Sequence, residues 1–242
     1  MFYEKRIRSV PFFQFSELEA IPGLVHAFTS RQTDQACGLE SVEPPGADKT
    51  TFLGLLGLSS EQTIQIRQIH SNRVLRRACA DSKHPEGDGL VFSKPGLFGI
   101  IKMADCLPVL VVDPVHRKLA VVHAGWRGTV GRILGRAIAE LTGTGSEASD
   151  LIVALGPCIR SCCYEVGADF PERFAEQEHD VDRIFQGRHL NLIEANRSEA
   201  EKAGVGRILD SGLCTCCNPE SFYSHRRDQD RRRMWALAGF VA

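Results

Sequence analysis

The sequence predicts a mixed α/β (α+β) protein, a single layered domain in which helices flank a mixed β-sheet. Three observations support this. The chain has 242 residues, 43% of them hydrophobic, which suits one domain that buries roughly three quarters of its unfolded-state surface. Short apolar runs typical of strands recur along the chain, and helical 3.6-residue periods interleave with them without strict alternation. We therefore expect residues 1–242 to form one domain.

The charge balance excludes several classes of protein. The chain carries 29 Lys+Arg against 30 Asp+Glu, and neither half is polybasic, so nucleic acid is not an expected partner. The apolar content argues against disorder. The longest stretches without a charged residue, Ala20–Ser30 and Thr50–Ser60, are about half as long as the roughly 20 apolar residues that span a bilayer. No membrane partner is expected either.

The first expected element is a strand at Val10–Phe15. Pro11 interrupts this apolar run, and Glu17 and Glu19 follow it directly. A signal peptide needs a longer apolar helix and a cleavage site of small residues, so we expect a cytoplasmic protein. The segment Thr33–Asp48 is rich in turn-forming residues and shows little periodicity, which predicts a surface loop.

Four apolar runs predict strands. In the first of them, period-two alternation places His70 on the same face as Ile64 and Ile66, which predicts that His70 points into the protein. The segment Leu107–Val112 is continuously apolar, as expected for a strand covered on both faces. The four predicted strands are Thr63–Leu75, Leu97–Val112, Leu119–His123 and Leu151–Leu155.

Four segments predict helices. Asp48 is suited to cap a short one that runs through Leu56 and ends at Gly57. The clearest has apolar residues every three or four positions on one face and charged residues opposite. Pro171 lies in the first turn of another, where proline is tolerated. The three longer predicted helices are Thr129–Leu141, Ala168–Gln177 and Ile193–Ala203.

Three predicted strand ends carry metal-ligand side chains: His70 in Gln-Ile-His, Cys106 in Ala-Asp-Cys, and His123 in Val-His-Ala-Gly-Trp-Arg-Gly. Two histidines and one cysteine form a known catalytic zinc set, with three protein ligands and one open position. From spacing alone, two hydrogen-bonded core histidines and a buried thiol are the simpler interpretation. The metal site is the alternative.

A glycine motif follows His123. Gly125, Gly128 and Gly131 are spaced G-x-x-G-x-x-G across a predicted strand-to-helix turn, with Arg127 beside them. Free N–H groups at a helix start and a nearby guanidinium form a potential phosphate cradle. The motif matches neither the dinucleotide fingerprint nor the Walker loop, and a tight turn with close helix packing explains the glycines as well.

Nine cysteines include two clusters, at residues 158, 162 and 163 and at residues 214, 216 and 217. Paired Cys-x-x-Cys knuckles, the usual mark of a structural zinc site, are lacking. An odd count in a chain of this size also argues against a secreted disulfide framework. We therefore expect reduced thiols in both clusters, without a second metal.

Near the C-terminus, residues 226–233 hold five arginines and two aspartates. Such a run suits contacts to phosphate groups, although a solvated or acid-paired surface is its more usual meaning.

Taken together, these motifs resemble the YfiH family. The matching segments, in order, are Gln68-Ile-His70, Met103-Ala-Asp-Cys106-Leu-Pro108, His123-Ala-Gly-Trp-Arg-Gly128, Leu155-Gly-Pro157, Cys162-Cys-Tyr-Glu-Val-Gly167, Cys214-Thr215 and Phe222-Tyr-Ser-His-Arg-Arg-Asp228. Proteins of this family were once labelled laccase-domain or multicopper polyphenol oxidases and were later described as zinc-containing purine nucleoside phosphorylases. Two positions depart from the family pattern, with Ser71 in place of glycine and Arg231-Arg-Arg-Met234 in place of Thr-Gly-Arg-Met.

The resemblance implies a mixed α/β fold and about one Zn²⁺ per chain, held by His70, Cys106 and His123. It also implies phosphate-dependent cleavage of adenosine, inosine, guanosine and methylthioadenosine, with adenosine deamination as a further activity. Purine nucleosides and phosphate are the expected partners of a monomer or small homo-oligomer. Cys106, His123 and Arg127 are the candidate catalytic residues.

Further residues follow from this expectation. Arg127 and the N–H groups after Gly128 would hold phosphate, and the metal would act as a Lewis acid or generate hydroxide. Additional candidates for phosphate or substrate contacts are Arg67, Tyr223 and Arg226. Candidates for proton transfer are Asp105, Glu165, Tyr223 and His225.

Three rival functions remain open from the sequence. Copper with polyphenol oxidase activity shares the His, His, Cys set, with Met103 as an axial ligand, but eight histidines without a His-x-His pair suit multicopper chemistry poorly. A Cys106/His123 nucleophile pair would give a thiol hydrolase. The third rival is a non-catalytic binding protein stabilised by a metal.

Overall fold

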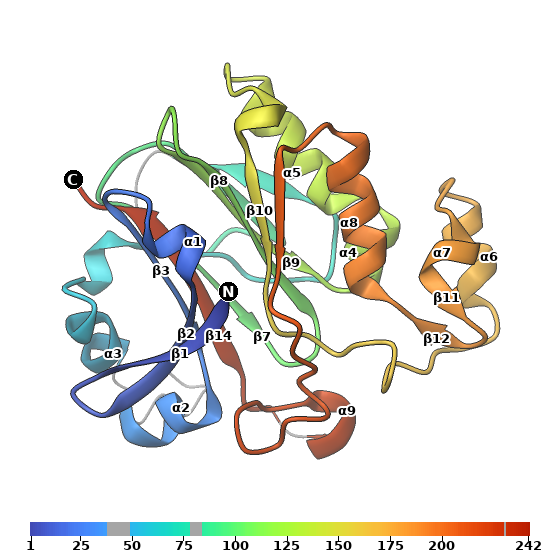
Figure 1. Cartoon of the computed structure of the whole chain (residues 1–242), viewed down its shortest axis with the longest axis horizontal. Coiled ribbons are helices and arrows are strands. Elements are labelled where there is room, and N and C mark those ends of the chain that lie inside the picture. Colours follow the sequence, from blue (N-terminus) through green and yellow to red (C-terminus); the bar gives the residue numbers. More distant parts are fainter. Residues whose placement is uncertain (38–48, 78–83, 230) are drawn as a thin grey trace.

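Two six-stranded β-sheets pack face to face, and helices cover their outer surfaces (Figure 1). The computed structural model describes residues 1–37, 49–77, 84–229 and 231–242. The expected mixed α/β class is confirmed, but the structure has two large mixed sheets where we expected one. Within the described residues, no helix combines the length and the apolar character needed to cross a membrane.

The first sheet joins strands from both ends of the chain. Its one parallel pair is β4 with β7, and its other neighbours are antiparallel. In spatial order the strands are β1 (Phe2–Ile7), β2 (Val10–Phe15), β3 (Leu24–Thr29), β14 (Met234–Phe240), β7 (Phe98–Met103) and β4 (Thr63–Gln65).

The second sheet is also mixed. Its pairs β10 with β13 and β5 with β6 are parallel, and the central strands are antiparallel. In spatial order it contains β13 (Arg207–Asp210), β10 (Ile152–Leu155), β8 (Leu107–Asp113), β9 (Lys118–Ala124), β6 (Gly89–Phe92) and β5 (Val74–Arg76).

Period-two alternation explains the layers. In β7, Ile101 and Met103 pack between the sheets, whereas Phe98 and Ile100 face the outer helices. The other sheet follows the same rule, since Leu110 of β8 joins the central core and its neighbours on the strand join the outer one. The central strands of each sheet are therefore apolar and covered on both faces, and every residue of β8 is buried.

Helices on the second sheet are α4 (Trp126–Val130), α5 (Ile133–Thr142) and α8 (Leu192–Lys202), and those on the first are α2 (Arg31–Cys37) and α3 (Lys49–Leu55). Smaller elements are α1 (Ser16–Glu19), η1 (Ser60–Gln62), η2 (Ala148–Asp150), α6 (Phe170–Ala175), α7 (Val181–Ile184), β11 (Phe185–Gln186), β12 (His189–Leu190) and α9 (His225–Asp228).

Several predicted elements need correction. The strand predicted at Thr63–Leu75 is two short strands with a loop between them, and Val10–Phe15 is the second strand rather than the first. The strand predicted at Leu97–Val112 is also two strands, β7 and β8, which a turn carries into different sheets. The helix predicted at Thr129–Leu141 is two helices, because Arg132 adopts a left-handed conformation with φ of 58°. Residues 33–37 of the predicted loop form helix α2, while Asp48 and the rest of that loop lie outside the described residues.

Candidate metal centre

The three candidate ligands meet where the chain passes from one sheet to the other. Cys106 lies in the turn from β7 to β8, and His70 in the loop from β4 to β5, so both segments cross between the sheets. His123 is near the end of β9 in the second sheet. One loop, one turn and one strand end therefore bring together the three residues that the sequence predicted as neighbours.

The ligand atoms lie close enough to share one ion. The ring nitrogens of His70 and His123 and the Sγ of Cys106 all lie within 4.8 Å of one another. The two imidazole rings have centroids 5.0 Å apart and an interplanar angle of 79°. His123 is buried, Cys106 is partly exposed and His70 is exposed, so one side of the group faces solvent.

The prediction that His70 points into the protein is wrong. Strand β4 ends at Gln65, so the alternation that includes Ile64 does not extend to His70. His70 instead adopts a left-handed conformation with φ of 57°, which is uncommon for a residue other than glycine and occurs where other contacts hold it.

Asp88 supplies those contacts. Its carboxylate is completely buried and accepts hydrogen bonds from the backbone N–H groups of Ile69, His70 and Ser71 at 3.3, 3.0 and 2.6 Å. The hydroxyl of Ser71 donates to the same carboxylate at 2.7 Å. The serine that departs from the family pattern therefore anchors the His70 loop through Asp88.

Asp88 also orients His123. The Nδ1–H of His123 donates to Asp88 Oδ1 at 2.9 Å, because an ionised carboxylate can only accept. This bond fixes the tautomer that leaves Nε2 available to a metal. Sequence reasoning missed Asp88, although the Gly87-Asp88-Gly89 tripeptide at the start of β6 was a usable signal.

Charges around the thiol favour metal binding. Burial acts to raise the pKa of Cys106, but the neighbouring His123 and His70 outweigh it and lower the pKa to about 6. Burial acts to lower the pKa of His123, while the Cys106 thiolate and the Asp88 carboxylate raise it to about 9. Without metal, the pair is therefore a thiolate and an imidazolium over the neutral pH range.

Gly125 leaves room beside the ligands. A β-carbon at this position would lie 3.0 Å from Cys106 Sγ and 3.3 Å from His70 Cδ2. Any larger residue would therefore press on two of the three ligand side chains. This steric limit explains why the first position of the motif is a glycine.

The backbone N–H groups after Gly128, which we expected to hold phosphate, lie inside a helix. Helix α4 begins at Trp126, not at Thr129, so the N–H of Thr129 donates within the helix to the oxygen of Gly125 at 2.9 Å. Gly128 is buried in α4 and packs close to the oxygen of Ser71. The Arg127 side chain is exposed and lies 4.3 Å from the centroid of the Trp126 ring, so it remains the candidate for phosphate contact.

Asp105 is held in place as an acceptor. Its carboxylate accepts hydrogen bonds from Thr215 Oγ1 at 2.6 Å, Ser224 Oγ at 3.1 Å and the backbone N–H of Arg226 at 2.7 Å. These three hydrogen bonds hold the carboxylate in place, so Asp105, one of the candidates for proton transfer, also anchors the backbone next to Cys106.

Tyr223, the other expected substrate contact near the C-terminus, lies in the interior. It is buried, and its hydroxyl donates to Asp34 Oδ2 at 2.7 Å. Two other candidates are engaged at the surface, since Arg67 pairs with Glu86 and Glu165 pairs with Arg188. His225 is exposed on α9.

Arg226 remains close to the centre. Its guanidinium donates to the backbone oxygens of Cys163 and Glu165 at 3.3 and 2.9 Å and lies 5.4 Å from the centroid of the Tyr164 ring. Burial raises the pKa of Tyr164, with Cys106 adding to the rise and Arg226 and Arg127 opposing it. These groups therefore share one electrostatic environment.

Comparisons with known proteins identify the family of this chain. A family described as "Multi-copper polyphenol oxidoreductase laccase" matches residues 47–241. The crystal structure of the hypothetical protein YfiH from Bacillus licheniformis superposes with a TM-score of 0.83 and 25% identity, covering 97% of this chain and 98% of that one. The chain belongs to the YfiH family.

Two similar YfiH-family relatives carry enzyme names. A protein from Deinococcus radiodurans named purine nucleoside phosphorylase is 34% identical over 229 residues, which cover 88% of each chain. Adenosine deaminase RL5, from an unknown prokaryotic organism, is 34% identical over 196 residues and is covered to 75%, with 74% of this chain matched.

The ligand set fits zinc. Two imidazole nitrogens and one thiolate around an open side correspond to a three-ligand zinc site, and the Asp88–His123 bond is the supporting contact such sites use. Copper fits less well, because Met103, the proposed axial ligand, packs in the core between the sheets. Among the described residues, only one group of potential ligands contains histidine, which is too few for a multicopper centre.

Proposed function

We propose that this YfiH-family protein is a zinc-dependent purine nucleoside phosphorylase that cleaves adenosine, inosine, guanosine and methylthioadenosine with phosphate. The observation that carries the proposal is the open-sided group formed by His70, Cys106 and His123. The phosphorylase name of the Deinococcus radiodurans relative supports it.

The chain's own residues suit this reaction. Phosphorolysis needs a site for a dianion and a means of stabilising the departing purine. Arg127 and Arg226 lie in the environment of Tyr164 and Cys106, and guanidinium groups bind phosphate with charge-assisted, bidentate hydrogen bonds. We assign phosphate binding to Arg127, with Arg226 as a second contact, because the charges of both and of the metal ligand Cys106 act on the same Tyr164 side chain.

His70, Cys106 and His123 would hold the zinc, which when bound supplies a Lewis acid and can generate hydroxide near neutral pH. Asp88 keeps two of these ligands oriented, and Asp105 fixes the backbone that precedes Cys106. Such rigid support is what an open metal site needs.

Adenosine deamination is a second candidate activity of the same centre. The name of the relative RL5 favours it, and the reaction requires a metal-activated water but no phosphate. A single centre therefore accommodates both reactions.

The test is incubation of purified, zinc-loaded protein with each of the four nucleosides, with and without phosphate, and chromatographic resolution of bases and sugars. We expect free base and ribose 1-phosphate (or its methylthio analogue) only when phosphate is present. Cys106→Ala is the matched control for the metal. Base release without phosphate would indicate a hydrolase, and no product at full zinc loading would favour the non-catalytic binding protein.

A further inference from the structure

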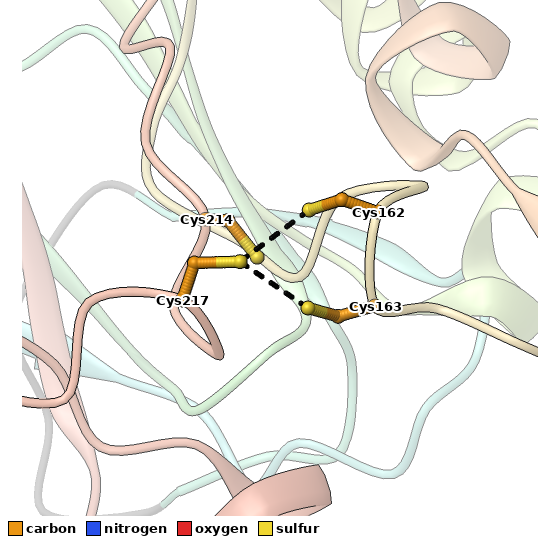
Figure 2. Close-up of side chains that lie close together, drawn as sticks. All are labelled: Cys162, Cys163, Cys214 and Cys217. Atoms are coloured by element: carbon orange, nitrogen blue, oxygen red, sulfur yellow. Dashed lines mark hydrogen bonds between the residues drawn. The ribbon is translucent and has the colours of Figure 1, made fainter.

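Four cysteines from the two sequence clusters converge on one point. The side chains of Cys162 and Cys163 face those of Cys214 and Cys217 across two loops (Figure 2). The Sγ of Cys217 lies 3.6 Å from that of Cys162 and 3.3 Å from that of Cys163, and all four sulfur atoms lie within 4.8 Å of one another. This group shares no residue with the His70, Cys106, His123 centre.

These separations match a tetrahedral metal site. Zinc–thiolate bonds of about 2.3 Å in tetrahedral geometry place the sulfur atoms about 3.8 Å apart. A disulfide would join only two of the four thiols and would not explain why the other two lie beside them. Four thiolates around one point are diagnostic of zinc or iron–sulfur chemistry, and the compact spacing suits a single ion.

We propose that Cys162, Cys163, Cys214 and Cys217 bind a second, structural zinc ion. The four ligands complete its coordination, so this site has no open position for substrate and differs in kind from the three-ligand centre. The proposal stands independently of the phosphorylase function.

The local backbone favours thiolates at this site. The N–H of Arg160 donates to Cys214 Sγ at 3.4 Å, a contact that supports a metal-bound sulfur. Parallel pairing of Cys158 with Cys214, through the N–H of Thr215 and the oxygen of Cys158 at 2.9 Å, holds the two loops in register. The sulfur atoms are thus positioned by main-chain hydrogen bonds.

Neighbouring guanidinium groups offset the charge. A zinc ion with four thiolates carries a net charge of about −2, which cations at the site stabilise. Arg227 donates to the backbone oxygens of Thr215 and Cys216, each at 2.9 Å, and Arg226 donates to the oxygen of Cys163. Both arginines therefore bind the backbone of the cysteine loops.

The proposed zinc would join the loop after β10 to the loop after β13. The second loop carries Thr215, which donates to Asp105 beside Cys106, and the first carries Tyr164, against which Arg226 packs. Both loops have little regular structure, so a metal crosslink is an economical way to fix them. The structural zinc would thereby hold the two loops that carry Thr215 and Tyr164 in place beside the candidate metal centre.

The proposal departs from our expectation of thiols without a second metal. That expectation rested on the absence of paired knuckles in the sequence, whereas the four ligands come from segments that meet only in the fold. The zinc expected in the purified protein rises from about one to about two ions per chain.

Elemental analysis of purified full-length protein tests this. We expect about two zinc ions per chain in the wild type and about one in both Cys163→Ser and Cys217→Ser. Cys216→Ser, which changes a neighbouring cysteine outside the group of four, should retain both ions. Cys106→Ala should lose only the ion of the His70, Cys106, His123 centre, so loss of zinc from one site can be told from loss at the other. An unchanged metal content in Cys163→Ser and Cys217→Ser, or iron in place of zinc, would overturn the proposal.

A measurement on the wild type guards against variants that fail to fold. Cys162 and Cys217 are exposed, so as free thiols they should alkylate quickly. We expect both to be protected until a strong chelator removes the metal. Equal alkylation rates with and without chelator, or a native disulfide between members of the group of four, would refute the assignment.

Discussion

Asp88 and His123 are joined twice. The His123 side chain donates from Nδ1 to the Asp88 carboxylate at 2.9 Å, and the His123 backbone N–H donates to the Asp88 backbone oxygen at 2.7 Å. Because the same carboxylate also holds the His70 backbone, one buried acid fixes the relative position of two candidate metal ligands. The centre is thus organised before any metal arrives.

Asp88→Asn should weaken zinc binding at this centre about 10- to 100-fold, since loss of a supporting carboxylate typically has that effect. Competition with a chromophoric chelator measures it, in a Cys163→Ser background so that only one site contributes. Asp113→Asn is the matched control, because buried Asp113 accepts from His116 Nδ1 at the same 2.9 Å but serves no candidate ligand. Wild-type affinity in Asp88→Asn would contradict the role given to Asp88.

Zinc binding to the metal-free centre should release about one proton per ion between pH 6 and pH 9. The lowered pKa of Cys106, about 6, means that the thiolate is already formed above that pH. The raised pKa of His123, about 9, means that zinc must displace a proton below it. Apparent affinity in the same Cys163→Ser background should therefore rise about tenfold per pH unit up to pH 9 and then level off. Calorimetry in buffers of different ionisation enthalpy gives the proton count, and a flat pH profile would argue against a protonated His123.

Gly125→Ala should lower zinc affinity and activity together. The added methyl group would lie 3.0 Å from Cys106 Sγ, tighter than nine in ten real β-carbon contacts, so the thiolate must shift by a few tenths of an ångström. Gly54→Ala in α3 is the control, because nothing lies within 4 Å of its added β-carbon and alanine favours a helix by about 0.5–1 kcal/mol. If Gly125→Ala binds zinc as the wild type does, the turn tolerates bulk and the steric argument fails.

Arg127→Ala should reduce phosphate-dependent cleavage about 30- to 1,000-fold, corresponding to a loss of about 2–4 kcal/mol in the transition state. The apparent KM for phosphate should rise, while any deamination falls far less, because that reaction uses no phosphate. Arg127→Lys retains the charge without the bidentate geometry, so its rate of phosphate-dependent cleavage should lie between those of the wild type and Arg127→Ala. Equal loss of both activities at full zinc content would assign Arg127 a general structural role.

Tyr223→Phe should destabilise the protein by about 1–3 kcal/mol, since it removes the buried hydrogen bond that the hydroxyl donates to the Asp34 carboxylate. Its kcat/KM should remain within about twofold of the wild type, because the hydroxyl points at Asp34 and not at the centre. Urea unfolding and steady-state kinetics report the two effects separately. A large loss of activity with unchanged stability would support a contact between Tyr223 and the substrate.

The parts of the fold predicted correctly are those with strong local patterns. The segments around Leu107–Val112 and Leu119–His123 are continuously apolar and form the buried centre of the second sheet. The helix break at Arg132 was missed because apolar periodicity continues across it, while the left-handed turn that separates α4 from α5 leaves no mark on that pattern.

The site was predicted in its ligands but not in its supports. The residue types of the three ligands, His70, Cys106 and His123, made them stand out in the sequence. Asp88 could not be told from the other acidic residues, because its role depends on five hydrogen bonds that only the fold creates. The four-cysteine group could not be predicted either, because its members are far apart in the sequence. Cys163 and Cys217 are 54 residues apart, and only the pairing of two loops brings them into contact.

The place of β14 has a consequence for biosynthesis. This strand is synthesised after the other strands of both sheets, yet it lies between β3 and β7 and pairs with both. Until it emerges, the nascent chain exposes two apolar strand edges that have no partner, a state prone to aggregation and to capture by chaperones. The turn that carries Cys106 follows β7 directly, so pairing of β14 with β7 steadies the strand that leads into one of the candidate metal ligands.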